Sequence, residues 1–298
     1  MLLDNLKKEF LLNNDEAISF INSAPNRYKV YKIKKRNGGE REIAEPTKSL
    51  KKLQYWALRE YLLNCETHSS ATAYVKNKNI KDFASPHARN KYLLKMDFKD
   101  FFNSIKGYDF IHFLKEHLSS ISEADAKLLT NIFFCRDKKS KNLYLSIGAP
   151  SSPFISNIMM INFDNKVSKF CMNNGIIYTR YADDLAFSTN NPNTLEILIE
   201  KIKIICEQLN YPKQLEINSG KTVFTSRKHN RTLTGLVISN DGKISIGREK
   251  KRKLRVIAHK ASLRLLDQES LDKFKGNLAF LLSIDPDFSN YLKQKANI

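Results

Sequence analysis

The sequence predicts an α+β protein in which helices surround antiparallel strands. Apolar residues recur at helical spacing in several long segments, such as 50–63 and 195–209. Short β-rich runs occur in pairs around turn residues, as in 28–44 and 176–189. Hydrophobic residues make up 42% of the chain, including 18 Phe and 12 Tyr, so a sizeable core can form.

The chain is strongly basic. Its 298 residues include 50 Lys and Arg against 31 Asp and Glu, which gives a formal net charge of +19. This balance argues against an enzyme of acidic metabolites and indicates a polyanionic partner. Because the charges are spread over the whole chain, we favour nucleic acid over an anionic membrane surface. The apolar content excludes a disordered basic tail.

The cysteines and the N-terminus indicate the compartment. The four cysteines are too far apart in sequence to form a C-x-x-C zinc pair or a dense disulfide framework. No apolar run is long enough for a signal peptide or a membrane-spanning helix. We therefore expect a reduced, cytoplasmic protein that makes no contact with a membrane.

The N-terminal third combines helices with a hairpin. Residues 1–24 predict a helical extension, in which Asn13-Asn14-Asp15 can cap a second helix. Residues 28–33 and 40–44 alternate on either side of Asn37-Gly38-Gly39, the pattern of a β-hairpin.

The next segment leads to the first candidate functional residue. Helical spacing resumes over 50–63, and 71–87 has the composition of a polar, lysine-bearing connection. Residues 92–96 form a short apolar run broken by Asp97, which predicts a buried strand that delivers a carboxylate at its end. Helical segments are expected from there to about residue 134, before a basic turn.

A strong helix is expected after Gly148-Ala149-Pro150-Ser151-Ser152-Pro153. A serine there can cap the helix, proline lies in its first turn, and apolar residues follow at helical spacing over 154–170. The β-rich runs 176–181 and 185–189 then flank Ala182-Asp183-Asp184, which predicts a hairpin with two carboxylates at its tip. After the helix at 195–209, short strands are expected around 215–217, 222–225 and 233–238. Residues 250–264 hold seven Lys and Arg and no acid, and would form a basic helix.

Three carboxylates can converge in this arrangement. If the strand ending in Asp97 neighbours the hairpin that carries Asp183 and Asp184, the like charges repel unless cations neutralise them. Carboxylate oxygens select Mg²⁺, or alternatively Mn²⁺, over zinc. Two such ions suit in-line phosphoryl transfer. An Asp-Asp pair by itself is more often a solvated turn, and the surrounding motifs decide against that interpretation here.

The chain resembles the reverse transcriptases. Tyr181-Ala182-Asp183-Asp184 is similar to their Y-x-D-D box, and Asp97-Phe98-Lys99-Asp100-Phe101-Phe102 to their first palm carboxylate motif. Gly148 to Pro153 resembles their template-side helix start, and Asn218-Ser219-Gly220-Lys221-Thr222 their following lysine motif. All four motifs occur in the family's order.

Within that family the chain is most similar to bacterial retron reverse transcriptases, over about residues 25–260. The matching features are Ala84-Ser85-Pro86-His87, Thr234-Gly235, and a compact length without a maturase or endonuclease extension. Phe83 departs from the asparagine usual in the retron segment, and Ile147 departs from the glutamine that often precedes the glycine.

The resemblance implies a right-hand polymerase fold. The N-terminal helical extension (1–24) would precede the fingers, 25–92, and a palm with an antiparallel sheet would follow over 93–245, with finger-side helices at about 107–145. A short helical thumb would occupy 246–298. The implied activity is RNA-templated DNA synthesis from dNTPs. For a retron the template is a structured non-coding RNA, synthesis starts from a guanosine 2′-OH, and the product is branched RNA–DNA (msDNA). Retrons are implicated in anti-phage defence, with effectors such as an ATPase and nuclease pair.

The resemblance also assigns roles to individual residues. Asp97, Asp183 and Asp184 would bind two metal ions, to which Phe98 would add a backbone carbonyl, and Lys221 would act as general acid toward pyrophosphate. Arg41 would clamp the triphosphate, and Phe102 would exclude ribonucleotides by clashing with their 2′-OH. Ala149 and Pro150 would line the nucleotide, with Ser151 on the template side. The remaining nucleic-acid contacts are expected at His87, Thr234, Gly235, Lys250, Lys251, Arg252 and Arg255.

Two alternatives remain. The chain can instead be another bacterial reverse transcriptase, of the group II intron, diversity-generating or abortive-infection type; the missing maturase and HNH domains argue against the intron type. It can also be a scaffold that holds nucleic acid and restrains a toxin. The intact Asp97, Asp183 and Asp184 argue against a purely non-catalytic scaffold.

Overall fold

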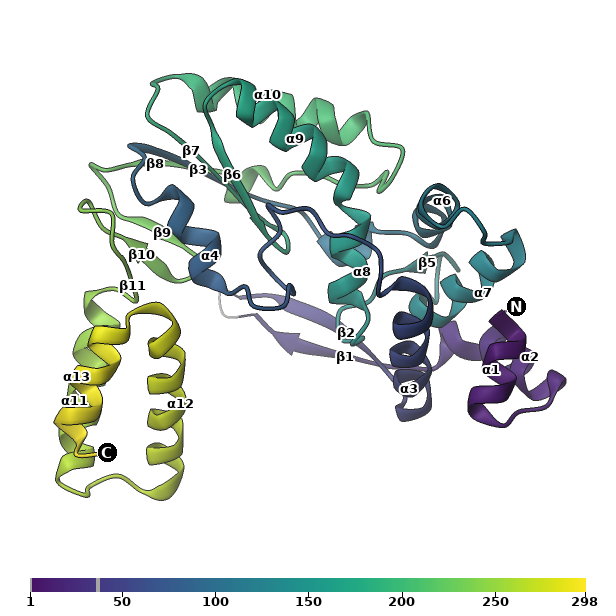
Figure 1. The fold of residues 1–298 in the computed structure, drawn as a ribbon, viewed down its shortest axis with the longest axis horizontal. Coiled ribbons are helices and arrows are strands. Elements are labelled where there is room, and N and C mark those ends of the chain that lie inside the picture. The colour runs from purple at the N-terminus through teal and green to yellow at the C-terminus, as the bar shows by residue number, and fades with distance from the viewer. Residues whose placement is uncertain (1, 36–37) are drawn as a thin grey trace.

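A computed structural model describes residues 2–35 and 38–298. Its centre is a four-stranded antiparallel sheet with the strand order β6–β7–β3–β8 (Figure 1). The central strands are β3 (Tyr92–Asp97), the apolar run that the sequence predicts as a buried strand, and β7 (Asp184–Thr189), the second β-rich run of the predicted hairpin. The flanking strands are β6 (Ile177–Tyr181) and β8 (Val223–Ser226).

The two faces of this sheet pack against different cores. Leu94 and Met96 join the larger core with helices α9 (Ile161–Asn173) and α10 (Thr194–Glu207). Leu93 joins the second core, which includes residues of the small sheet and the C-terminal helices. Since side chains alternate along a strand, Lys95 and Asp97 share the face of Leu93. The carboxylate therefore lies on the side of the sheet that faces the C-terminal lobe.

The N-terminal part builds a second body around the hairpin of β1 (Tyr28–Lys34) and β2 (Glu40–Pro46). The hairpin meets the loop before α8 (Ser152–Met159), where the Ala44 N–H donates to the Ile147 carbonyl at 2.8 Å. A Cβ at Gly148 would lie 2.9 Å from Ile43 Cγ2, and φ there is +119°. Only glycine allows this close approach. The remaining elements of this body are α1 (Leu2–Phe10), α2 (Asn14–Ser23), α3 (Lys48–Ala57) with a π turn at Leu58–Leu62, α5 (Phe101–Ser104), α6 (Gly107–His117), α7 (Glu123–Phe133), β4 (Cys135–Arg136) and β5 (Leu143–Tyr144).

The C-terminal part is a small sheet followed by three helices. Strands β9 (Arg231–Leu233), β10 (Leu236–Ile238) and β11 (Ile244–Ser245) form the sheet. Helices α11 (Arg248–Ser262), α12 (Gln268–Ile284) and α13 (Pro286–Ala296) form a separate lobe, at the lower left of Figure 1. The basic helix predicted from 250–264 is α11.

Five expectations about local structure need correction or fall outside the described residues. The segment 71–87 is partly helical, with α4 (Ile80–Ala84) and a 3-10 turn at Ser85–His87, because buried Phe83 and Ala84 anchor it. The apolar stretch 154–170 is broken at Met160 into α8 and α9. Residues 215–217 contribute one isolated bridge, Phe98 to Ile217, and 233–238 is a hairpin. The predicted turn residue Asn37 lies outside the described residues.

All four cysteines are free thiols in the structure. Within the described ranges, none of the helices combines the length and apolar character needed to cross a membrane.

Candidate active site

Two carboxylates face each other across the central strand pair. Asp97, the last residue of β3, is the register partner of Asp184, the first residue of β7. Asp183 lies in the turn between β6 and β7, and its carbonyl accepts a hydrogen bond from the Phe98 N–H at 3.1 Å. Neighbouring antiparallel strands therefore bring together carboxylates that are 86 positions apart in sequence, as the sequence predicts.

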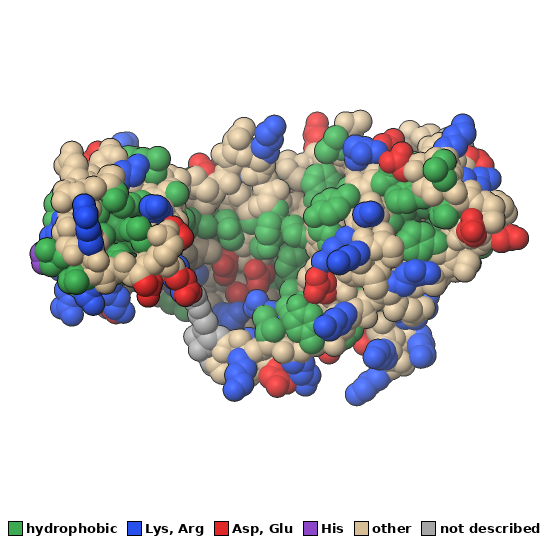
Figure 2. All heavy atoms as spheres, turned by 90° about the horizontal axis from the view of Figure 1, so that it is seen from below, with side chains coloured by type: hydrophobic (Ala, Val, Ile, Leu, Met, Phe, Trp, Pro, Cys, Tyr) green, Lys and Arg blue, Asp and Glu red, His purple; other side chains and the backbone are tan. Residues whose placement is uncertain are grey.

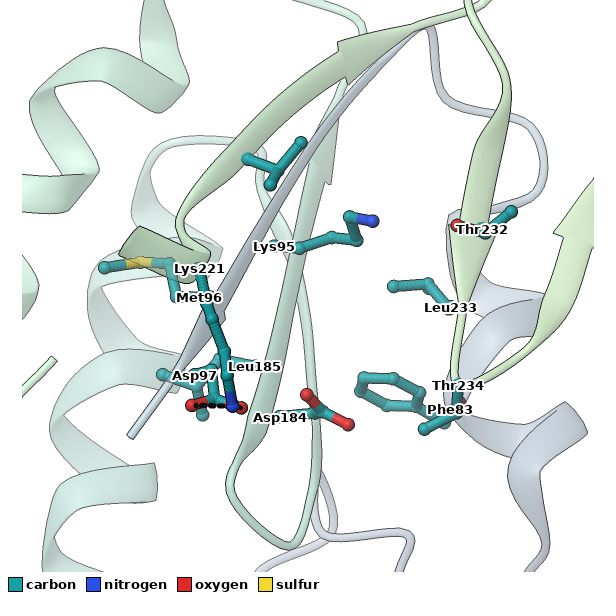
Figure 3. Close-up of a pocket in the computed structure, with 11 residues that line it drawn as sticks. Phe83, Lys95, Met96, Asp97, Asp184, Leu185, Lys221, Thr232, Leu233 and Thr234 are labelled. Atoms are coloured by element: carbon teal, nitrogen blue, oxygen red, sulfur yellow. Dashed lines mark hydrogen bonds and ion pairs between the residues drawn. The ribbon is translucent and has the colours of Figure 1, made fainter. Parts of the chain in front are cut away.

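Lys221 reaches this cluster from the segment after α10. The Asn218 N–H donates to the Asp97 carbonyl at 2.8 Å, which fixes this segment alongside the end of β3. The Lys221 ammonium then donates to both Asp97 carboxylate oxygens at 2.9 Å (Figure 3). The lysine motif and the first carboxylate motif thus meet at one ion pair.

The electrostatics of the cluster favour an added cation. Burial, together with the charges of Asp183 and Asp97, raises the pKa of Asp184 to about 6. Burial and Asp97 also raise the pKa of Asp183. Lys221 acts in the opposite direction on both groups, and Lys95 does so on Asp184. The cluster carries more negative charge than these lysines compensate at neutral pH.

The donor set fits a divalent metal ion, although the side chains do not form a closed cage. In the described part of the chain, no three acidic, His or Cys side chains converge closely enough to hold an ion as they stand. The Lys221 ammonium supplies the neutralising charge at Asp97 instead. The available ligands are all carboxylate oxygens, which suit Mg²⁺ or Mn²⁺. Asp97, Asp183 and Asp184 are therefore the residues that would bind it.

A cavity opens between the carboxylates and the β1–β2 hairpin. Arg41 from β2, Phe102 from α5 and Ala149 from the loop before α8 all line it, together with Asp97, Asp183 and Lys221. Figure 2 shows this region as a hollow beside the C-terminal lobe, with acidic side chains on its floor and hydrophobic, basic and acidic side chains around its edge. Phe101 is buried in the core, and Phe102 is half-buried at the cavity.

The comparisons with known proteins agree with this geometry. Residues 33–238 match the family described as reverse transcriptase (RNA-dependent DNA polymerase). The chain is 40% identical over 270 residues to the retron Ec83 reverse transcriptase of Escherichia coli, which covers 90% of this chain and 86% of that protein. The chain belongs to the retron reverse transcriptases. It is thus an RNA-directed DNA polymerase, of a family that generally uses divalent metal ions.

Further relatives support the same family and fold. The enzyme is 32% identical over 285 residues to the retron Ec73 reverse transcriptase of Escherichia coli, covering 91% of this chain and 88% of that protein. A solved structure of telomerase from Candida albicans, with a fragment of telomeric RNA, aligns with a TM-score of 0.51 and 13% identity. That alignment covers 93% of this chain and 58% of the telomerase chain, and it supports the right-hand polymerase fold.

A buried ion pair holds the hairpin that carries the two aspartates. Arg180 donates to Asp164 of α9 through Nη2 at 2.7 Å and through Nε at 2.9 Å, and both side chains are completely buried. The same guanidinium donates to the Asn157 side chain at 3.1 Å and to the Ala182 carbonyl at 3.2 Å. Ala182 has a φ of +55°, an uncommon value for a non-glycine residue. The ion pair therefore fixes the turn that positions Asp183.

Two of the predicted nucleic-acid contacts are buried instead. His87 is 1% exposed, and its ring nitrogens bond to Ser188 Oγ and Thr179 Oγ1, each at 2.7 Å. Burial lowers its pKa to about 3, so the ring is neutral and joins the turn before β3 to the sheet. Ser151 is fully buried as well, and its side chain does not cap α8. The expectation that these side chains face nucleic acid is wrong for this structure.

The other expected nucleic-acid contacts lie at the β9–β10 turn and on helix α11. Thr234 and Gly235 form the exposed turn between β9 and β10, and the Lys250 ammonium lies 3.6 Å from where a Cβ of Gly235 would be. Lys251 instead pairs with Asp285 at 2.5 Å and lies over the Phe288 ring. The remaining two residues, Arg252 and Arg255, are exposed on α11, and Arg255 lies over the Phe288 and Tyr291 rings.

Phe83 and Ile147, at which the sequence departs from the family pattern, both form hydrogen bonds through their backbone. The Phe83 carbonyl accepts a hydrogen bond from Thr179 Oγ1 at 3.0 Å, and its ring lies 5.7 Å from that of Tyr181. The Ile147 carbonyl accepts from Ala44 in the hairpin. The backbone carbonyls of both residues therefore accept hydrogen bonds that help to position the site.

Two cavity residues were missed by the sequence interpretation. Lys95 extends across a pocket between the sheet and β9, toward Thr232 (Figure 3). Lys95 lies two residues before Asp97 on the same strand, so the two side chains share one face of the sheet. The alternation of side chains along a strand could therefore have identified Lys95. Tyr74 lines the cavity near Arg41 and comes from the segment expected to be a polar connection. No periodic pattern identifies it.

We expect Asp184→Asn to stabilise the metal-free enzyme at pH 7.5 and to have little effect at pH 4. The raised pKa means that ionisation of Asp184 in the folded state opposes folding as the pH rises through about 6. The gain in the free energy of unfolding should be on the order of 2 kcal/mol. Urea denaturation with a chelator present measures it at both pH values.

Two controls interpret this result. Added Mg²⁺ should stabilise the wild type more than the variant, because the ion removes the repulsion that the substitution also removes. Asp15→Asn, at the exposed start of α2, should show neither effect. An equal change in stability at pH 4 and pH 7.5 would contradict the raised pKa.

Proposed function

We propose that this enzyme synthesises msDNA, a branched RNA–DNA molecule, on a structured non-coding RNA. The observation that carries the proposal is the cross-strand pair Asp97 and Asp184. Asp97, its partner Lys221 and Asp183 line a cavity that Arg41 and Phe102 also line. This combination suits templated addition of deoxynucleotides. Similarity to retron reverse transcriptases over most of the chain supports the retron type of template.

The carboxylates would serve the nucleotidyl transfer. We propose that Asp97, Asp183 and Asp184 bind two divalent ions, Mg²⁺ or Mn²⁺, with the Phe98 carbonyl as a further ligand. When bound, such ions would offset the negative charge of the reacting phosphate and would lower the pKa of the attacking hydroxyl. Lys221 would give up its place beside Asp97 when metal binds, and its ammonium would donate a proton to the departing pyrophosphate.

The cavity lining would select and hold the nucleotide. Arg41 is exposed on the hairpin strand and faces the carboxylates, so its guanidinium can bind the triphosphate with two parallel hydrogen bonds. The Phe102 ring stands beside the carboxylate floor, where it would clash with a ribose 2′-OH. Buried Ala149 and half-buried Pro150 would line the base-pair side with backbone atoms.

The domain division follows the usual right-hand arrangement. We propose that 25–92 form the fingers, 93–245 the palm and 246–298 the thumb, after the N-terminal extension 1–24. The separate C-terminal lobe with its basic helix α11 supports the assignment of the thumb. The duplex would then pass between the lobe and the sheet, along the exposed turn of Thr234 and Gly235.

We expect Asp183→Asn to abolish DNA synthesis while RNA binding remains near the wild-type level. Removing one charged ligand weakens metal binding at the reacting phosphate, whereas the basic surface that holds RNA is unchanged. Primer extension with Mg²⁺ and a filter-binding assay measure the two properties. Asp15→Asn serves as the matched control and should extend normally. Extension by Asp183→Asn at a near wild-type rate would refute the assignment of the active site.

We expect the double variant Lys250→Gln/Arg252→Gln to weaken duplex binding and to flatten its salt dependence. Each phosphate contact adds about 0.9 to the slope of log K against log salt for a DNA duplex, so the slope should fall by roughly 1 to 2. Binding curves across a salt series test this. Lys201→Gln/Lys203→Gln on α10, on the far side of the sheet, is the control. An unchanged slope in the first variant would leave α11 as an ordinary solvated surface.

A structured RNA should be the preferred template, with synthesis starting at an internal 2′-OH. Recognition would come from the polymerase body, in which the exposed turn Thr234-Gly235 lies beside the Lys250 ammonium of α11. A glycine with φ of +83° lets a backbone approach closely, and hydroxyl donors suit 2′-OH groups. In the anti-phage role that the resemblance implies, the product would be held for an effector such as an ATPase and nuclease pair.

The test is to purify the enzyme with the RNA of its own locus, extend it with dNTPs, and treat the product with a nuclease specific for 2′,5′ linkages. We expect the enzyme to produce DNA that this nuclease releases from the RNA. Product that resists debranching, or equal extension of an unrelated RNA from a 3′-OH primer, would favour a general reverse transcriptase.

A further inference from the structure

One aromatic side chain in the nucleotide cavity has no role in the proposal so far. Tyr74 lines the same cavity as Arg41, Phe102 and Asp183, and half of its side-chain surface is exposed there. Across residues 2–35 and 38–298, its hydroxyl has no hydrogen-bond partner. A tyrosine that presents a free hydroxyl toward a cavity between a cation and a carboxylate is suited to bind a polar ligand.

The backbone at Tyr74 is strained. Its φ is +60°, which is rare for a bulky residue with a Cβ. Such conformations persist where surrounding contacts impose them, and they cluster at functional sites. Ala182, in the turn beside Asp183, and Asp100, which lines this cavity, also have positive φ values. Tyr74 is therefore one of several residues with positive φ values that lie around the carboxylates.

The contacts that impose this conformation come from the palm. Asn157 donates to the Ala73 carbonyl at 2.7 Å, and the Thr72 N–H donates to the Arg180 carbonyl at 2.8 Å. The Lys78 ammonium donates to the Ala71 carbonyl at 2.9 Å and closes the loop from its other end. Arg180 and Asn157 also hold the hairpin of Asp183. The same buried groups therefore position Tyr74 and the catalytic turn relative to each other.

The charges around the phenol keep it a hydrogen-bond donor. Burial is the largest cause that raises the pKa of Tyr74, and the charges of Asp183 and Tyr181 raise it further. The charge of Arg41 lowers it. Tyr74 shares its cavity with Arg41, the proposed triphosphate clamp, and with Asp183, a proposed metal ligand. The phenol remains protonated at neutral pH, so it can donate to an anionic oxygen.

We propose that Tyr74 is a nucleotide-positioning residue whose hydroxyl donates a hydrogen bond to a phosphate oxygen of the incoming dNTP. This inference rests on the proposed function, because it requires the triphosphate to lie between Arg41 and the carboxylates. The ring adds an apolar wall to the cavity that Phe102 also lines. The role is one of binding and orientation, and no proton leaves the phenol.

The test measures dNTP affinity separately from chemistry and from nucleic-acid binding. An RNA template with a dideoxy-terminated DNA strand forms a complex that binds the next dNTP without reacting. We expect Tyr74→Phe to raise the Kd of that dNTP roughly ten-fold, the effect of losing one hydrogen bond to a charged group. The affinity for the template and primer should stay unchanged. Tyr55→Phe, an exposed tyrosine on α3, is the matched control.

A second variant separates the side chain's function from its effect on folding. Asparagine tolerates a positive φ better than tyrosine, so Tyr74→Asn should keep or raise the melting temperature. It should nevertheless raise the Kd of the dNTP at least as much as Tyr74→Phe does. A loss of stability together with lower affinity for every ligand would show that Tyr74 is only structural.

The outcomes distinguish this inference from the function on which it rests. If the wild type binds the correct dNTP and Tyr74→Phe binds it equally well, the inference is wrong and the proposed function stands. If Arg41→Ala and Asp183→Asn also leave dNTP binding unchanged, the proposed nucleotide site itself is wrong, and the role of Tyr74 is refuted with it.

Discussion

The buried ion pair between Arg180 and Asp164 is the constraint on which the active site depends. Breaking a buried pair by removing one partner leaves an uncompensated charge and typically costs about 3–5 kcal/mol. The Arg180 guanidinium satisfies its donors with Asp164, Asn157 and the Ala182 carbonyl, and the Tyr178 hydroxyl donates to Asp164 at 2.7 Å. Helices α8 and α9, strand β6 and the aspartate turn are therefore tied to one buried point.

This rigidity matters because the carboxylate cluster works against folding. Burial and the charge of Asp97 raise the pKa of both Asp183 and Asp184, and the charge of Asp183 raises that of Asp184 further. A flexible turn would let the charged groups separate and would lose the arrangement that the proposed metal site requires. The Arg180 network holds the turn in a positive-φ conformation that the repulsion alone would not select. The packing and hydrogen bonds of the palm core thus offset the repulsion among the aspartates and hold them close together.

Charge is distributed in two layers around that cluster. The chain as a whole carries a net charge of +19, which attracts a polyanion, whereas the floor of the hollow is acidic (Figure 2). Lys221 and Arg41 stand at the boundary, close enough to act on the charge of Asp183. Nucleic acid can therefore be held by the outer basic surface, while the acidic floor is left for cations and the reacting phosphate.

The sequence by itself determined the elements and the identity of the central carboxylates. Alternation and apolar runs predict β3, β6 and β7, and the order of four motifs predicts that Asp97 meets the Asp183 hairpin. The tertiary structure decided what depends on side-chain contacts between distant segments. His87 and Lys251 are residue types that often contact nucleic acid. In this structure His87 instead forms a hydrogen bond with Ser188, and Lys251 forms an ion pair with Asp285. Tyr74 belongs to a segment without periodicity and is placed by Arg180 and Asn157. Local patterns report which face of an element is apolar, whereas the partner of a polar side chain is set only when the chain has folded.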